Sequence, residues 1–217
     1  MNKISILTTI VTCIVLSAQA QIKLDAVLGG GTTYLEQYYD ASNKVRTKPD
    51  YSINAGFKAA TKFRKDGMLG IELGALISYT GFKNIPQLKT QDGNLVFDED
   101  NPISVRSLYL KVPLTLDFNV YERFGLLLGG HLNLRLSKKE EFQALITAQD
   151  HSGIDSKFRK ITPGIHLGFY GKVNDRIRID GQVFSDVLPR LQNDKFVDKL
   201  YFMELGFSIN CQYRLNP

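Results

Sequence analysis

Two of the three histidines come nearest to a catalytic or metal-binding arrangement. His131 and His166 belong to neighbouring segments in which apolar and polar residues alternate, and both fall on the polar face. With Glu72 or Glu204 nearby, they would form an acid–base pair or a metal site. They fit equally a hydrogen-bond network of polar side chains that share one face. We favour the network, because constellations of this kind have a high false-positive rate.

Other residues with chemical potential do not assemble into a known motif. Gly29-Gly30-Gly31 lacks the Gly-Lys-Ser/Thr that completes a phosphate loop, and no helix follows it. Lipid-modifying barrel enzymes need a serine beside the histidine, at a position that lipid can reach. Ser78 and Ser208 point inward, so we cannot assemble such a site. Cys211 is the only cysteine beyond the N-terminal segment, which excludes a cysteine-based zinc site. We therefore expect no catalytic residue, no metal site and no cofactor.

The first twenty residues have the pattern of a secretory signal peptide. Lys3 supplies a positive charge, residues 4–16 form a short apolar core, and Ala18-Gln19-Ala20 is a small-x-small cleavage site. The apolar run is too short for a membrane-spanning helix. We expect residues 1–20 to be removed and residues 21–217 to form one domain.

Alternating apolar and polar residues recur through the rest of the chain, as in strands with one apolar and one polar face. The connections between these segments alternate strictly between short and long. This rhythm is typical of an outer-membrane barrel with short periplasmic turns and long extracellular loops. The predicted strands cover 22–37, 51–64, 68–82, 105–120, 123–136, 160–173, 176–188 and 200–214. The sequence therefore predicts an all-β fold: a single up-and-down antiparallel transmembrane barrel of about eight strands.

Aromatic residues on the apolar faces gather at the two ends of the predicted strands. Those at the ends beside long loops are Tyr34, Tyr51, Tyr79 and Tyr201, and those beside short turns or the C-terminus are Phe63, Phe118, Phe124 and Tyr213. Two aromatic rings that bound an aliphatic band are what membrane barrels place at their interfaces. A soluble, lipocalin-like barrel would keep its apolar residues inside, and the charged opposite face argues against it.

The polar faces carry charges of both signs that would point into the lumen. Because buried charges persist only when they are paired, we expect an ion-pair network that fills the lumen. Its expected members are Lys58, Glu72, Lys111, Asp117, Arg135, Arg178, Asp180, Glu204 and Arg214. Glycines on the same faces are expected to make room for the long basic side chains.

Pro113 stands in the middle of the most regular predicted strand. Alternation points it into the lumen, and a proline cannot donate a hydrogen bond to a neighbouring strand. We expect it to be a structural device that creates a bulge or bend and helps a small barrel to curve.

The segment around this proline resembles the PorT-like family of bacterial outer-membrane barrels. Members show a Tyr-Leu-x-Ile-Pro-Leu strand, a short turn, and then an aromatic residue, an aliphatic run and a glycine pair. Residues 109–114 match the first part with Val112 in place of Ile, and Phe124 with Gly129-Gly130 match the second. The chain departs from many outer-membrane barrels by ending Tyr213-Arg-Leu-Asn-Pro217 instead of on an aromatic residue. The resemblance implies a barrel in the outer membrane of a Gram-negative bacterium, where some relatives take part in protein secretion.

The net charge of +5 fits a surface near anionic lipid, so we expect contact with outer-membrane lipid and lipopolysaccharide and none with nucleic acid. Asp92-Gly93 between two alternating runs predicts a hairpin that protrudes from the barrel. Its strand edges would capture a protein partner on the extracellular side. The expected function is a non-enzymatic structural or partner-binding role. The alternatives are a small pore and, less favoured, a lipid-modifying enzyme.

Overall fold

Eight long strands make up most of the computed structural model, which describes residues 22–39, 43–46, 48–63, 67–91, 94–136, 159–188, 192–193 and 200–216. The barrel strands are β1 (Lys23–Tyr39), β3 (Asp50–Lys62), β4 (Leu69–Gln91), β5 (Asn94–Asn119), β6 (Phe124–Arg135), β7 (Ile161–Lys172), β8 (Ile177–Asp186) and β10 (Leu200–Arg214). Two short strands, β2 (Asn43–Arg46) and β9 (Gln192–Asn193), pair with the ends of β1 and β10. In the part of the chain that is described, no helix is long and apolar enough to cross a membrane.

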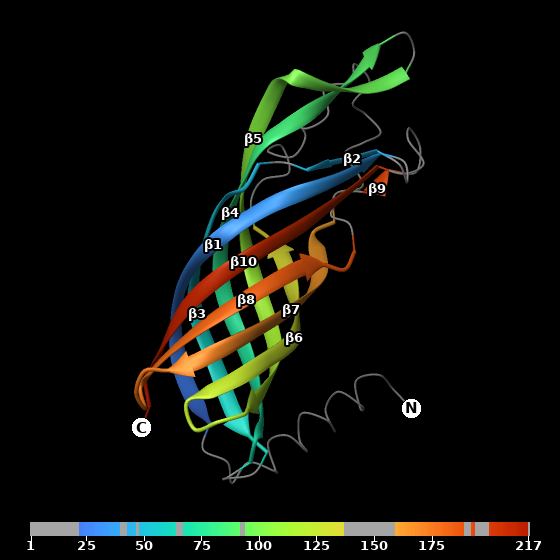
Figure 1. Ribbon diagram of the computed structural model, residues 1–217. Coiled ribbons are helices and arrows are strands. Elements are labelled where there is room, and N and C mark those ends of the chain that lie inside the picture. Colours follow the sequence, from blue (N-terminus) through green and yellow to red (C-terminus); the bar gives the residue numbers. More distant parts are fainter. Residues whose placement is uncertain are drawn as a thin grey trace, which may run out of the picture.

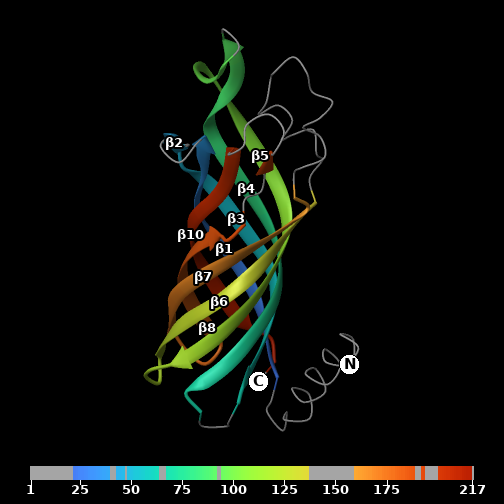
Figure 2. The same cartoon turned by 90° about the vertical axis from the view of Figure 1, so that its right-hand side faces the viewer.

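The strands form a closed antiparallel barrel. Each barrel strand pairs with the next one along the chain, and β1 pairs with β10 from Asp25↔Arg214 to Tyr39↔Leu200, which closes the ring. Figures 1 and 2 show the tilted strands around a narrow cylinder. Closure leaves no sheet edge along the wall. The predicted fold class, an up-and-down barrel of eight strands, is confirmed.

The two ends of the barrel differ. At one end, which we call the short-turn end, tight turns are closed by bonds such as Tyr121 N–H to Phe124 O and Val173 N–H to Ile177 O. The start of β1 and the end of β10 also lie at this end. The opposite end, which we call the long-connection end, carries the additional strands β2 and β9, neither of which alternation predicted.

Strands β4 and β5 continue far beyond the rest of the barrel as a two-stranded ribbon. Their pairing runs on to Gln91↔Asn94, with two register shifts between Phe82 and Gln87 where the ribbon leaves the wall. Such irregularities bend and twist a strand pair. Both views show the ribbon projecting at the long-connection end. The protruding hairpin predicted from the sequence is confirmed, although residues 92–93 at its tip lie outside the described part.

The outer wall is apolar and the interior is polar, which is the reverse of a soluble barrel. Outward side chains such as Leu28, Phe57 and Ile165 are more than half exposed, whereas the inward Glu72 and Asp180 are 1 % and 0 % exposed. A continuous apolar surface of this size would be unfavourable in water. In hydrocarbon it is the stable arrangement, because the closed ring satisfies the backbone of the wall.

Pro113 is buried on the inward face of β5, but it creates no bulge. Pairing between β4 and β5 stops after Leu73↔Leu114 and resumes at Leu76↔Lys111 in the same register. The bulge that we expected is therefore absent, since a bulge would add a residue to one strand and shift the register. On the other side of β5, Pro113 pairs with His131 without interruption.

The pairing of β5 is interrupted only on the side of β4, because the nitrogen of Pro113, which lacks a hydrogen, faces β4. The bond from Asn119 N–H to Met68 O marks a hydrogen-bonded pair, and such pairs recur at every second residue of an antiparallel ladder. Pro113 opposite Gly74 belongs to the same series, so its nitrogen faces β4. A side-chain carbon on Gly74 would come within 2.9 Å of both Pro113 Cγ and Lys58 Cγ. Gly74 thus gives space to the proline ring that interrupts the ladder.

We predict that Pro113→Ala folds with unchanged register and completes the ladder. The new N–H at residue 113 faces Gly74 O and should form the missing bond, so its hydrogen exchange should be slow. Amide exchange measured by NMR in a lipid bilayer checks this, with Asn119 as the internal reference. Exchange at residue 113 as fast as at Glu122, in the exposed turn, would contradict this account of the gap.

Candidate functional site

Five charged side chains meet in the lumen towards the short-turn end. We call Lys58, Glu72, Asp117, Arg178 and Asp180 the charge cluster. Arg178 Nη1 lies 2.5 Å from Glu72 Oε1 and 3.4 Å from Asp117 Oδ2. Lys58 Nζ lies 3.6 Å from Glu72 Oε2 and 4.0 Å from Asp180 Oδ2. Four strands supply these residues, because inward positions of β3, β4, β5 and β8 meet across a narrow barrel.

Asp180 is completely buried and is held mainly by amide groups. Gln182 Nε2 and Asn210 Nδ2 each donate to Asp180 Oδ1 at 2.8 Å, and Gln212 Nε2 donates to Oδ2. Three donors and the nearby Lys58 offset the cost of removing this carboxylate from water. Alternation placed these amides on the polar face, but it gave no sign that they converge on one residue.

The aromatic ring of Tyr170 packs against the charge cluster. The Arg178 guanidinium lies 4.5 Å from the centre of the Tyr170 ring, which is a cation–π distance. Tyr170 is 1 % exposed and its hydroxyl donates to Asn119 Oδ1 at 3.1 Å. The neighbouring inward Leu127 is also fully buried.

The two histidines lie together in the lumen, with ring centroids 5.7 Å apart. His166 Nε2 is hydrogen-bonded to Thr115 Oγ1 at 2.9 Å, and His131 meets the edge of the Phe184 ring at 6.1 Å. Ser78 contacts Thr80 and neither histidine. Within the described residues, no group of three histidine, cysteine, aspartate or glutamate residues is arranged to hold a metal ion.

The remaining residues of the expected network lie outside the charge cluster. Arg214 Nε pairs with Asp25 Oδ1 at 3.2 Å, at the short-turn end. Lys111 Nζ lies 4.1 Å from the centre of the Phe184 ring. Arg135 and Glu204 belong to the polar faces of β6 and β10 nearer the long-connection end.

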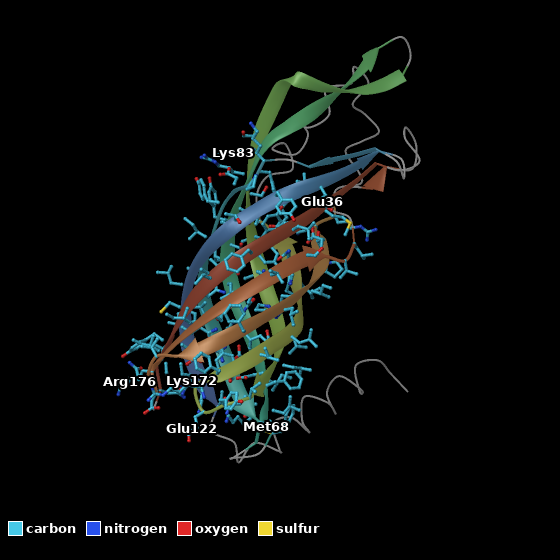
Figure 3. All side chains as sticks on the ribbon, in the orientation of Figure 1. Glu36, Met68, Lys83, Glu122, Lys172 and Arg176 are labelled. Atoms are coloured by element: carbon cyan, nitrogen blue, oxygen red, sulfur yellow. The ribbon has the colours of Figure 1, made fainter. Side chains whose placement is uncertain are left out.

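Those of the expected interface aromatics whose side chains the structure describes lie on the outer wall. Among those near the short-turn end, Phe63, Phe118, Phe124 and Tyr213 are 38–62 % exposed. At the other end, Tyr51 is 40 % exposed, its ring lies 6.2 Å from that of Tyr79, and Arg106 lies 5.6 Å from it. Tyr34 is half-buried, while the side chain of Tyr201 lies outside the described part. Figure 3 places Lys83 at the long-connection end and Lys172, Arg176 and Glu122 at the short-turn end.

An eight-stranded antiparallel barrel with an apolar wall and a polar, filled interior has the fold of small outer-membrane barrels. No protein-family model matches the chain, and no curated protein matches it. Among solved structures, the chain is similar to Neisserial surface protein A, with 13 % identity over 88 % of this chain and 97 % of that one, at a TM-score of 0.44. It is also similar to the attachment invasion locus protein Ail of Yersinia pestis, with 12 % identity, 88 % and 98 % coverage and a TM-score of 0.39. The outer membrane protein AlkL in lipid bilayers shows 11 % identity, 91 % and 92 % coverage and a TM-score of 0.45.

We predict that Glu72→Gln lowers the free energy of unfolding by about 3–5 kcal/mol, because it leaves Lys58 and Arg178 buried with less compensating charge. Denaturant unfolding in lipid micelles measures the change. Glu122→Gln, the same substitution at an exposed turn, is the matched control and should change stability by less than about 0.5 kcal/mol. Equal effects of the two variants would show that the charge cluster contributes nothing specific.

The adjacent glycines of the pair Gly129-Gly130 provide a second prediction. A side-chain carbon at Gly129 would lie 2.2 Å from Leu114 O and 2.8 Å from His166 Nε2, whereas one at Gly130 meets nothing closer than 3.4 Å. Gly129→Ala should therefore destabilise the barrel by about 1–3 kcal/mol through overpacking. Gly130→Ala should be neutral or slightly stabilising. A reversed order in denaturant unfolding would refute this view of how the histidines are accommodated.

Proposed function

We propose that this protein is a non-enzymatic component of the outer membrane of a Gram-negative bacterium that binds a protein partner through its extracellular side. The observation that carries the proposal is the ribbon that extends beyond the wall, together with the charged side chains that meet in the lumen. A filled lumen leaves the surface outside the membrane as the place where recognition occurs. Residues 1–20 act in this scheme as the export signal.

The orientation follows from the two ends of the barrel. Both ends of the barrel chain, the start of β1 and the end of β10, lie at the short-turn end. In outer-membrane barrels, short turns face the periplasm and long connections face outward. The ribbon of β4 and β5 is then extracellular, and the apolar wall with its aromatic residues contacts membrane lipid and lipopolysaccharide.

The ribbon offers strand edges to a partner. Strand β3 follows β4 only to Ser52↔Thr80, and β6 follows β5 only to Tyr109↔Arg135. Among the described residues, the strands from Ile85 onward pair only with each other. A two-stranded ribbon whose outer edges pair with no other described strand supports recognition by strand addition, in which main-chain hydrogen bonds supply much of the affinity.

The resemblance around Tyr109 and Pro113 supports membership of the PorT-like barrels, and with it a role beside a secretion machinery as one form of partner binding. A small pore is the alternative, but the charge cluster and Tyr170 argue against an open path. A lipid-modifying enzyme is less favoured still, because His131 and His166 lie inside the lumen, where lipid chains do not reach.

We expect no stable conductance steps from the purified barrel in planar bilayers, because the charge cluster fills the lumen. The matched test is Glu72→Ala together with Arg178→Ala, which empties part of the same cross-section and should increase ion leak if the variant folds. A steady single-channel current from the wild-type barrel would overturn the closed lumen and favour the pore.

The partner-binding role predicts contact at the ribbon and not at the opposite end. A photoreactive phenylalanine analogue in place of Lys89 or Val96, which face each other across the ribbon, should form a discrete protein adduct in native cells. The control is the same analogue at Tyr121, which is 73 % exposed in a short turn. Adducts at Tyr121 alone would relocate the partner to the periplasmic side.

A further inference from the structure

We propose that the short-turn mouth of the barrel is a dead-end binding site for a multiply charged phosphate group. A pocket with a cavity volume of about 50 Å³ lies inside this end. Its walls come from several strands and from the turn between β7 and β8. No step of the partner-binding proposal uses this site.

The pocket is strongly cationic. Six lysine and arginine side chains and three aspartates line it. Two of the arginines are already paired, Arg214 with Asp25 and Arg178 with Asp117. The four remaining cations, Lys23, Lys62, Lys172 and Arg176, face a single remaining lining carboxylate, that of Asp175.

Three lysines contribute most of this excess positive charge, and they come from three different strands. Lys23 begins β1, Lys62 ends β3 and Lys172 ends β7. Lys172 donates to the carbonyl oxygen of Glu122, and Arg176 donates to the hydroxyl of Tyr213. Within the described residues, no carboxylate lies within ion-pair distance of Lys23 or Lys62.

The three lysines repel one another, because Lys23, Lys62 and Lys172 line the same pocket and carry like charges. An anion bound among these cations offsets their mutual repulsion, so its binding is favourable.

Several features of the site favour phosphate. Lysine ammonium groups act as compact point charges that suit phosphate oxygens without requiring one fixed plane. Their origin on three strands suits an anion with several charged oxygens more than a single carboxylate. At the inner end Arg178 contacts both Glu72 and Tyr170, and in this proposal these side chains keep a bound anion from passing through. The phosphate group can belong to a lipid headgroup of the adjacent leaflet or to a soluble anion.

The test uses pyrophosphate as the probe and the full mature barrel in nanodiscs of neutral phosphatidylcholine. Isothermal titration at low ionic strength should show saturable binding that weakens as salt is added. Removing one contact charge at this solvent-exposed mouth should weaken binding about fivefold, so Lys23→Gln/Lys62→Gln should weaken it about 25-fold. Lys62→Gln alone serves if the double variant does not fold.

The matched control is Lys48→Gln/Lys160→Gln, which removes the same charge from exposed positions at the opposite end. It should bind pyrophosphate like the wild type. Absence of binding to the wild type, or an equal loss in both double variants, would overturn the proposal. Replacing part of the lipid by phosphatidylglycerol separates the two sources: lost pyrophosphate binding assigns the site to a lipid headgroup, and unchanged binding assigns it to a soluble anion.

Discussion

Closure of β1 on β10 is the constraint on which the rest of the structure depends. In hydrocarbon, a backbone N–H or C=O without a partner costs several kcal/mol, so the wall tolerates no open edge. Eight strands satisfy this requirement with a narrow ring, and alternation then sends every second side chain into a confined space. An apolar exterior forces the polar side chains inward, and the charge cluster is the result.

The charge cluster shows how a narrow barrel tolerates buried charged side chains. Glu72 lies between Lys58 and Arg178, while Asp180 receives three amide donors from β8 and β10. Each of these residues depends on partners from other strands, so the cluster is stable only in the closed ring. It contributes specificity as well as stability, because a strand in another register would separate the partners.

Much of the fold could be predicted from the sequence, whereas the height of each residue in the lumen could not. Alternation places Glu72 and Arg178 on the polar face, but their meeting depends on the tilt and stagger of β4 against β8. For the same reason, the convergence of Gln182, Asn210 and Gln212 on Asp180 has no sequence signal. At Pro113, alternation predicts the inward face correctly. Whether the proline causes a bulge depends on the partner strand β4, where Gly74 accommodates the proline ring and makes a bulge unnecessary.

The filled lumen also divides the molecule into two independent surfaces. At the long-connection end the ribbon offers main-chain edges, and at the short-turn end the lysines offer uncompensated charge. Recognition at the ribbon is directional and local, whereas attraction of an anion is long-ranged and screened by salt. The wall strands connect the two ends directly, so coupling between the ends would travel along these strands. Strands β4 and β5 are the only described barrel strands that run from the ribbon to the short-turn end, where they present Gly70 and Asp117 to the lumen. They are therefore the elements through which the two ends would communicate.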